Sequence, residues 1–411
     1  MIVSTESNIR YLHIPLNSPI SHLGILVNAG TRDELENEFG AAHLIEHLLF
    51  KGTKSKSARV VSRKFDNIGA DINAYTTKEE TCYHVSFLSE YYPRMMELLS
   101  DMLFNPSFIK KEVENEINVI KEEIASYYDS PSELIFDEFE DALFENHSIG
   151  HNILGNVDSL NEFNKNQSKI FDFYSKNYSN ENIIIWSSGN ISDKKFNSLF
   201  MKYFGNSTLQ NNSNNRIAPQ QIKKFNINTK RHDTQCHSII GGRAFSYHEK
   251  QRTAFTLLNN YLGSQAMTAR LNYVLREKYG LVYHVESSYI PYQDTGTFNV
   301  FFECDKNNHS KISKLVFDEL KKCKENKFSN SVLNIAKQQL KGNIAVLSDS
   351  KLSETLALAK SLASYNKIES IEETFAKIDA ITAEEIQEVA NIIFDNNNLS
   401  QLTYFPSNGD Q

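Results

Sequence analysis

Cysteine is scarce in this chain, and the few cysteines show none of the spacings that build a disulfide or metal framework. The sequence of 411 residues has four cysteines and no C-x-x-C pair; they are Cys82, Cys236, Cys304 and Cys323. Scattered thiols in a chain of this size are typical of proteins from a reducing compartment. We therefore expect a cytoplasmic location.

Segments that direct a protein into a membrane are also missing. The N-terminal residues MIVSTESNIRYLHIPLNSPI lack a basic stretch followed by an apolar one, which is the pattern of a secretory signal peptide. No apolar run is long enough to cross a bilayer. The sequence thus predicts neither a signal peptide nor a membrane span.

Positive charge is outweighed by negative charge. The chain has 43 lysines and arginines against 51 aspartates and glutamates, which gives a formal net charge of −8. Since no basic stripe is visible either, the composition argues against nucleic acid as the main partner. A hydrophobic content of 40% is typical of globular proteins. The length favours two domains of about 200 residues each over a single core.

A polar segment divides the chain almost equally. Residues 209–225 are rich in Asn and Gln and show almost no apolar periodicity, which predicts a linker. The predicted domains are therefore residues 1–208 and residues 226–411.

The two halves resemble each other in the order of their predicted elements. Residues 21–34 and residues 236–249 both indicate a strand followed by an acidic turn. Residues 67–88 and residues 278–303 both indicate two strands around a turn, and two amphipathic helices follow in each half. This order predicts two similar α+β domains related by an internal repeat, each with helices packed on one face of a mixed sheet.

The stretch AAHLIEHLLFKGT, residues 41–53, places two histidines and a glutamate in an apolar run. On a helix that turns about 100° per residue, Glu46 and His47 lie about −60° and 40° from His43, so the three share one arc. The opposite arc is apolar and consists of Leu44, Ile45, Leu48 and Leu49. Histidines four residues apart can reach one zinc ion, and H-x-x-E-H is the inverted form of a zinc-protease motif.

A third ligand is required, because catalytic zinc usually has three protein ligands. Residues 108–131 form a predicted helix whose apolar stripe begins at Val113. With Val113 at zero, Glu116 and Glu123 lie at about −60° and −80°, beside that stripe, whereas Glu122 lies at about 180°. The phase therefore favours Glu123 over Glu122 as an inward-reaching group. An ordinary charged flank of a surface helix is the alternative for Glu116 and Glu123.

These motifs resemble a known family. HLIEH followed by FKGT, then GADINAYTTKEETCY and VIKEEI, is similar to the pitrilysin/insulinase family of zinc metallopeptidases, over nearly the whole chain. The similarity is greatest to the two-domain processing peptidases. It implies a Zn²⁺ ion held by His43, His47 and Glu123, with Glu46 as the general base and Glu116 in support of the site.

The second half carries a further resemblance. MTARLNYVLREKYGLVYHVESS, residues 267–288, is similar to the family's Arg-then-Tyr element, which corresponds to Arg276 and Tyr283. The preceding LGSQAM is poorer in glycine than the family's pattern. The resemblance implies that Arg276 and Tyr283 stabilise the oxyanion formed during peptide hydrolysis.

The resemblance also implies how substrate binds. A peptide would add as a strand beside Asn73, Ala74 and Tyr75, held through main-chain hydrogen bonds. Phe50, one turn after His47 on the predicted helix, would line a side-chain pocket. The remaining histidines have simpler interpretations: His84 is expected to be structural, and His147 and His151 are expected to be loop residues among glycines.

The sequence therefore predicts a zinc-dependent endopeptidase that cleaves short or unfolded peptides with metal-activated water. The resemblance also implies that the domains pair as two halves of a clamshell around a chamber. A chain of two domains would supply one half, so the expected assembly is a homodimer, with a heterodimer of related subunits as the other possibility. Two alternatives stay open: a non-catalytic scaffold subunit of the same family, and an unrelated metal-binding module with a fortuitous motif.

Overall fold

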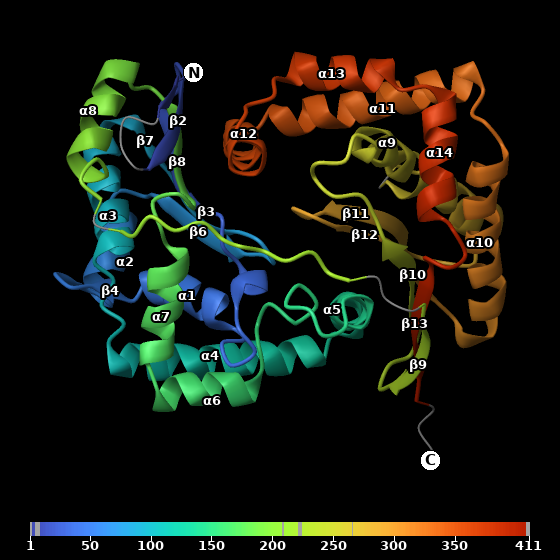
Figure 1. The fold of residues 1–411 in the computed structure, drawn as a ribbon, viewed down its shortest axis with the longest axis horizontal. Helices are drawn as coiled ribbons and strands as arrows, with labels where there is room; N and C mark the ends of the chain where they lie inside the picture. Colours follow the sequence, from blue (N-terminus) through green and yellow to red (C-terminus); the bar gives the residue numbers. More distant parts are fainter. Residues whose placement is uncertain (1, 5–8, 208, 221–223, 265, 408–411) are drawn as a thin grey trace. The chain divides into compact units, whose positions relative to one another are not determined.

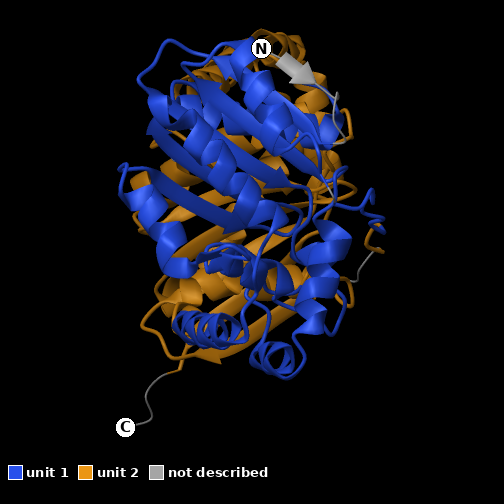
Figure 2. Ribbon diagram, turned by 90° about the vertical axis from the view of Figure 1, so that its left-hand side faces the viewer, with its two compact units in different colours: residues 1–126, 151–217, 348–368 blue, residues 127–150, 218–347, 369–411 orange. Residues whose placement is uncertain are grey.

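The computed structural model describes residues 2–4, 9–207, 209–220, 224–264 and 266–407. The chain forms two compact units, coloured separately in Figure 2. Unit 1 consists of residues 1–126, 151–217 and 348–368, and unit 2 consists of residues 127–150, 218–347 and 369–411. Within the described residues, no helix is long and apolar enough to span a membrane.

Unit 1 is built on a mixed six-stranded sheet in the order β1-β2-β8-β3-β7-β6, in which β2 and β8 are parallel (Figure 1). Its strands are β1 (Ile2–Ser4), β2 (Arg10–Pro15), β3 (Ile20–Val27), β6 (Asp71–Thr76), β7 (Thr81–Leu88) and β8 (Ile183–Gly189), beside a small ribbon of β4 (Gly52–Thr53) and β5 (Lys56–Ser57). Its helices are α1 (Ala41–Leu49), α2 (Ala58–Asp66), α3 (Tyr92–Phe104), α4 (Lys110–Tyr128), α6 (Val157–Lys165), α7 (Ser168–Asn177), α8 (Asp193–Tyr203) and α12 (Lys351–Tyr365).

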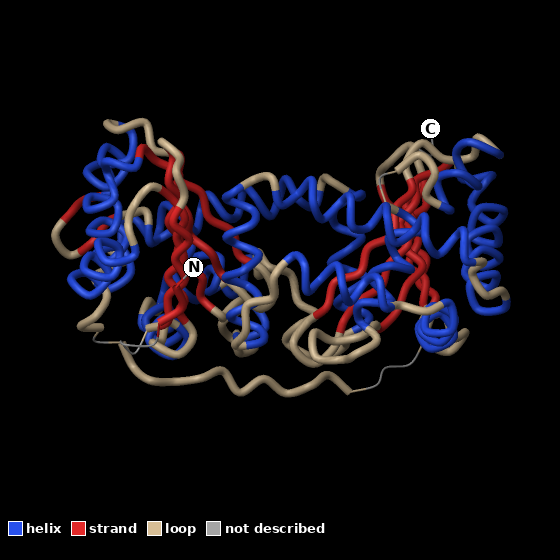
Figure 3. Tube along the Cα trace, turned by 90° about the horizontal axis from the view of Figure 1, so that it is seen from above, coloured by secondary structure: helices blue, strands red, loops and turns tan. Residues whose placement is uncertain are grey.

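Unit 2 has a five-stranded mixed sheet in the order β11-β12-β10-β13-β9, in which β9 and β13 are parallel. Its strands are β9 (Asn226–Arg231), β10 (Cys236–Arg243), β11 (Val285–Pro291), β12 (Gly296–Cys304) and β13 (Ser400–Pro406). Its helices are α5 (Pro131–Leu143), α9 (Arg252–Gly263), α10 (His309–Glu325), α11 (Asn330–Ser348), α13 (Ile371–Ala380) and α14 (Ala383–Ile393). Figure 3 shows the strands of each unit gathered in one sheet, with helices along it.

The two sheets share one plan, which confirms the predicted pair of similar α+β domains. In both, a parallel pair lies towards one edge, and the hairpin at the other edge is formed by β7 and β6 in unit 1 and by β12 and β11 in unit 2. In each unit a helix follows the strand that pairs with this hairpin: α1 follows β3, and α9 follows β10. The repeat was visible in the sequence because strand, turn and helix signals recur in the same order.

Alternate residues of the strands point to opposite faces, and both faces of each sheet are covered. In unit 1, Leu23 and Ile25 of β3 belong to the large core beneath α1, α3 and α4, whereas Leu26 faces α12. In unit 2, Ile240 of β10 belongs to the core beneath α9 and α10, whereas Ile239 faces α5. One face of each sheet is therefore covered by a helix from the other half of the chain.

This exchange of α5 and α12 makes the compact units discontinuous in sequence. Apolar side chains drive it: Phe139 of α5 packs with Leu402 and Tyr404 of β13, and Leu362 of α12 packs with Leu12 and Trp186 of unit 1. The predicted domain boundaries at residues 208 and 225 describe where the two copies of the repeat meet in the sequence, and they stay a prediction. The compact units are defined by packing and have different boundaries.

The only tryptophan, Trp186 on β8, is fully buried and lies directly against Gly24 on β3. A Cβ atom at Gly24 would lie 2.2 Å from Cε2 of the indole. The ring can therefore lie across β3 only because residue 24 has no side chain.

We expect Gly24→Ala to lower the free energy of unfolding of unit 1 by about 1–3 kcal/mol, because the added methyl group overlaps the indole ring. Urea unfolding followed by circular dichroism measures this, since the signal comes from the helices and strands of both units, including unit 2, which contains Gly342. Gly342→Ala is the matched control: its Cβ meets no atom within 4 Å on helix α11, so that variant should not lower the midpoint. Equal destabilisation by both variants would contradict the packing argument.

Candidate active site

Helix α1 presents one apolar and one polar face, as the helix phase predicts. Leu44, Ile45, Leu48 and Leu49 are buried in the core of unit 1. His43, Glu46 and His47 are half-buried on the other side. The apolar arc therefore anchors the helix, and the three titratable side chains are left at its surface.

The start of α1 is fixed by Glu34, whose side chain is fully buried. Its two carboxylate oxygens accept hydrogen bonds from the backbone N–H groups of Gly40, at 2.9 Å, and Ala42, at 2.8 Å. His151 Nε2 lies 2.8 Å from the same carboxylate, and its ring stacks on Phe39. Burial raises the pKa of Glu34 well above its usual range. His151 is thus a loop residue with a structural contact that the sequence did not reveal.

The predicted metal ligands lie together. Nε2 of His43 and Nε2 of His47 each lie 3.9 Å from a different carboxylate oxygen of Glu123, on helix α4. In the part of the chain that the structure describes, these three residues form the one group of His, Cys, Asp or Glu side chains with ligand atoms all within 4.8 Å of one another. Glu122, next in the chain, is exposed.

The donor set fits a zinc ion. Zinc bonds of 2.0–2.1 Å in tetrahedral geometry separate two ligand atoms by about 3.3–3.4 Å, so the 3.9 Å separations need only small side-chain adjustments. Burial, with the neighbouring His47, lowers the pKa of His43 to about 3, so His43 is neutral and its lone pair can bind a metal. Two imidazoles and one carboxylate leave a fourth position for water.

Glu116 supports His47. Its carboxylate, only 6% exposed, lies 3.1 Å from Nδ1 of His47 and 2.8 Å from Nζ of Lys51. Burial opposes the charged form, but the hydrogen bonds from His47 and Lys51 lower the pKa of Glu116. A proton held on Nδ1 leaves Nε2 of His47 available as the metal ligand.

Glu46 lies beside His43, His47 and Glu123, which we call the metal group, and it is held by a residue that the sequence did not single out. Thr76, the last residue of β6, donates a hydrogen bond from Oγ1 to Oε2 of Glu46 at 2.5 Å. Burial raises the pKa of Glu46, and the Thr76 hydrogen bond opposes this rise. A threonine in a strand has no periodic signal of its own, so the contact became visible only when β6 was placed beside α1.

Strand β6, which carries the three predicted substrate-binding residues, is an edge strand of its sheet. Asn73, Ala74 and Tyr75 pair with β7 on one side. Such an edge is where a peptide can add as a further strand. Tyr75 also contacts α12, because Lys360 lies over its ring at 5.0 Å. Phe50 follows the end of α1, with its ring centroid 6.0 Å from that of Tyr83.

Arg276 and Tyr283 belong to unit 2. Arg276 lies in a π-helical segment, Asn272–Lys278, and its side chain is 50% exposed. Tyr283 is 87% exposed. Segments of π-helix are rare and often occur at functional sites. Both side chains are accessible to a substrate, and their roles stay predictions.

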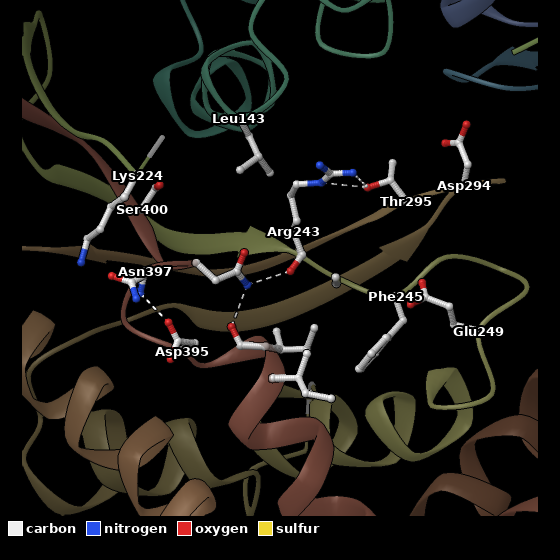
Figure 4. A pocket seen from close by; sticks show the side chains of 14 residues that line it. Leu143, Lys224, Arg243, Phe245, Glu249, Asp294, Thr295, Asp395, Asn397 and Ser400 are labelled. Carbon is white, nitrogen blue, oxygen red and sulfur yellow. Dashed lines mark hydrogen bonds between the residues drawn. The ribbon is translucent and has the colours of Figure 1, made fainter. Parts of the chain in front are cut away.

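Unit 2 also contains a cavity of about 460 Å³ (Figure 4). Arg243 lines it and donates hydrogen bonds to Oγ1 of Thr295 at 3.2 and 3.0 Å. Asp294, Glu249 and Phe245 also line it. The cavity includes none of the predicted site residues, so it is not the candidate active site.

Two family models match the chain. The model described as Insulinase (Peptidase family M16) matches residues 14–157, and the model described as Peptidase M16 inactive domain matches residues 166–340. The chain belongs to the pitrilysin/insulinase family of peptidases. The first match includes the three residues of the metal group and the neighbouring Glu46: His43, Glu46, His47 and Glu123.

Curated relatives carry protease names. The chain is 29% identical over 374 residues, 90% of each chain, to a Bacillus subtilis protein named uncharacterized zinc protease YmxG. It is also 29% identical over 386 residues to an uncharacterized zinc protease of Mycobacterium leprae, covering 92% of this chain and 85% of that protein.

Solved structures share the fold. One, described as a peptidase M16 inactive domain from Pseudomonas fluorescens, covers 100% of both chains with a TM-score of 0.90 at 19% identity. Another, a protease from Helicobacter pylori, covers 98% of this chain and 99% of that one with a TM-score of 0.87 at 20% identity. At these identities the likeness shows the two-unit α+β architecture.

We expect Glu123→Gln to weaken zinc binding by at least about 100-fold, because loss of a ligand costs more than the 10–100-fold typical for loss of a ligand's hydrogen-bond partner. Glu122→Gln is the matched control and should leave the affinity unchanged, since Glu122 is exposed. Competition with a chromophoric chelator measures both affinities. Similar losses in the two variants would show that α4 presents a different face to the metal.

Proposed function

We propose that this protein is a zinc-dependent endopeptidase. The observation that carries the proposal is the meeting of His43, His47 and Glu123 around one point, with Glu46 on the same face of α1. The family and the names of the relatives support a peptidase, and the donor set supports zinc as its cofactor. The edge strand β6 beside α1 gives a peptide a place to bind.

The residues around the metal group have distinct roles in this proposal. A bound zinc ion would polarise the scissile carbonyl group and acidify a water molecule. Glu46 accepts the proton of the attacking water and then donates it to the leaving amine. Thr76 keeps the carboxylate of Glu46 in place through its 2.5 Å hydrogen bond. Glu116 holds the ring of His47 in the orientation that points Nε2 at the metal.

Substrate recognition in this proposal is mainly through the main chain. A peptide that pairs with Asn73, Ala74 and Tyr75 must be extended, so the enzyme would select unfolded or short peptides. Main-chain pairing carries little sequence information, and side-chain preference would come from pockets near Phe50.

The oxyanion formed during hydrolysis needs a donor besides the metal. We assign this role to Arg276 and Tyr283, as the resemblance implies. In the proposed homodimer these residues of one chain act on a peptide bound at the metal group of the other chain.

The second candidate is a non-catalytic subunit of the same family. The match of residues 166–340 to a model described as an inactive domain favours it. That match includes Arg276 and Tyr283 but none of the metal ligands, which lie within residues 14–157. Cleavage of a quenched fluorescent peptide by the purified protein distinguishes the two candidates.

We expect Glu46→Gln to keep its zinc content and fold but to lower kcat by about 10²–10⁴-fold, because an amide cannot accept the proton. Peptide cleavage, zinc analysis and circular dichroism of the same preparation measure these properties. A chelator should abolish the activity of the wild type, and added zinc should restore it. Glu122→Gln serves as a control with normal activity. A Glu46→Gln protein with a tenth of wild-type turnover would remove Glu46 from this role.

We expect an inactive Glu46→Gln protein and an inactive Tyr283→Phe protein to regain activity when mixed under conditions of subunit exchange. With random pairing, half of the dimers are mixed and each holds one intact site, so about a quarter of wild-type activity should return. Subunit exchange is verified separately with fluorescent labels. If exchange occurs without recovery, the two chains do not share an active site.

A further inference from the structure

Residues 209–217, predicted as part of a polar linker, lie along unit 1 as an extended segment, which we call the strap. Along it exposed and half-buried residues alternate: residues 211, 213, 215 and 217 are exposed, and residues 212, 214 and 216 are half-buried. A period of two is that of an extended chain with one side against the protein. The inward positions are occupied by Asn212, Asn214 and Arg216 in place of apolar side chains.

The asparagines attach the strap through specific hydrogen bonds. Asn212 Nδ2 donates to the carbonyl of Lys176 at 3.1 Å. Asn214 accepts from Nδ2 of Asn182 at 2.9 Å and donates to the carbonyl of Asn28 at 2.5 Å. These contacts place the next inward side chain, Arg216, at the end of β3.

Arg216 enters a buried network of four charged side chains. Its side chain is 3% exposed, and its guanidinium makes a two-point contact with Asp33, with Nε at 2.9 Å and Nη2 at 2.8 Å from the carboxylate oxygens. Nη2 also donates to the carbonyl of Glu79 at 2.8 Å. Arg32 binds the Glu79 carboxylate at 2.5 Å and donates to the carbonyl of Ile217 at 2.8 Å. The positive charges of two arginines are thus balanced by two carboxylates, and all four side chains are largely shielded from solvent.

This network contacts the turn between β6 and β7, residues 77–80, through the carbonyl and the carboxylate of Glu79. The backbone N–H groups of Thr31 and Arg32 donate to the carbonyls of Thr77 and Lys78, at 3.2 and 2.7 Å. The approach is so close that a Cβ at Gly30 would lie 2.3 Å from the Thr77 oxygen. The turn follows Thr76 directly, so its position sets the end of β6.

We propose that Arg216 is a positioning residue of the active site. By fixing the turn after β6, it keeps the edge strand in place for a peptide and keeps Thr76 within hydrogen-bond distance of Glu46. The effect on substrate rests on the proposed peptidase function, whereas the effect on β6 does not. In this proposal the strap belongs to unit 1 and helps to position β6. The chain enters unit 2 directly after Ile217.

Hydrogen–deuterium exchange of the full chain tests the effect on β6 without any assay of activity. In Arg216→Gln, amides of residues 71–80 should exchange about tenfold faster or more, because the two-point contact is lost. Amides of α8, residues 193–203, should exchange as in the wild type. Asn215→Ala, on the exposed side of the strap, is the matched control and should change neither segment. Wild-type exchange at residues 71–80, or equal acceleration at α8, would overturn the proposal.

Arg216→Lys separates positioning from general stability. Lysine keeps the positive charge opposite Asp33 and Glu79 but cannot make the planar two-point contact. We expect this variant to unfold at nearly the wild-type temperature while residues 71–80 still exchange faster than in the wild type. It also carries the test if Arg216→Gln does not fold. Normal exchange at these residues in Arg216→Lys would show that Arg216 supplies only charge balance.

Steady-state cleavage of a peptide tests the effect on substrate. Because β6 binds the peptide before reaction, KM should rise about fivefold or more in Arg216→Lys, and zinc content should stay unchanged. An unchanged KM in an active enzyme would refute the role in substrate binding. If the wild type itself does not cleave peptides, the proposed function fails, and the exchange experiment alone decides the role of Arg216.

Discussion

Glu34 is a fully buried carboxylate, and its contacts decide where helix α1 begins. Burial of a carboxylate is costly unless its oxygens are hydrogen-bonded. Here they accept from the backbone N–H groups of the N-cap residue Gly40 and of Ala42 in the first turn of α1, and they contact His151. With the start fixed, the phase of the helix places His43, Glu46 and His47 on the side away from the core.

The metal group combines this rigid helix with a second one. The apolar stripe of α4, which includes Ile117 and Ile120, anchors this helix in the core of unit 1. Glu116 and Glu123 flank that stripe. One of these acids orients His47, and the other faces both histidines. Since each of the three predicted ligands lies on a helix packed against the same core, their donor atoms are already close together, which would reduce the cost of organising a metal site.

Helices α5 and α12 each cover the sheet of the other half of the chain, because each sheet has two apolar faces that must be shielded from water. The helices next to each sheet in sequence cover one of its faces, and the apolar residues on the other face must be shielded as well. In each unit a helix from the other half of the chain provides that cover. In unit 1 this helix also reaches the edge strand of the sheet, because Lys360 lies over Tyr75 of β6.

The sequence by itself determined the local elements of this protein: the two faces of α1, the inward phase of Glu123 and the repeated order of strands and helices. These follow from short-range periodicity, because apolar residues at helical or strand spacing must face a core. Only the tertiary structure decided which polar residues hold the site in place. Glu34 and His151 are 117 residues apart, and Arg216 and Asp33 are 183 apart. Hydrogen bonds between such distant polar side chains leave no periodic pattern in the sequence. For the same reason the sequence predicted a linker where the strap lies. Half-buried and exposed residues alternate along the strap as they do along a strand, but the half-buried positions hold asparagine and arginine in place of the apolar residues that reveal a buried strand.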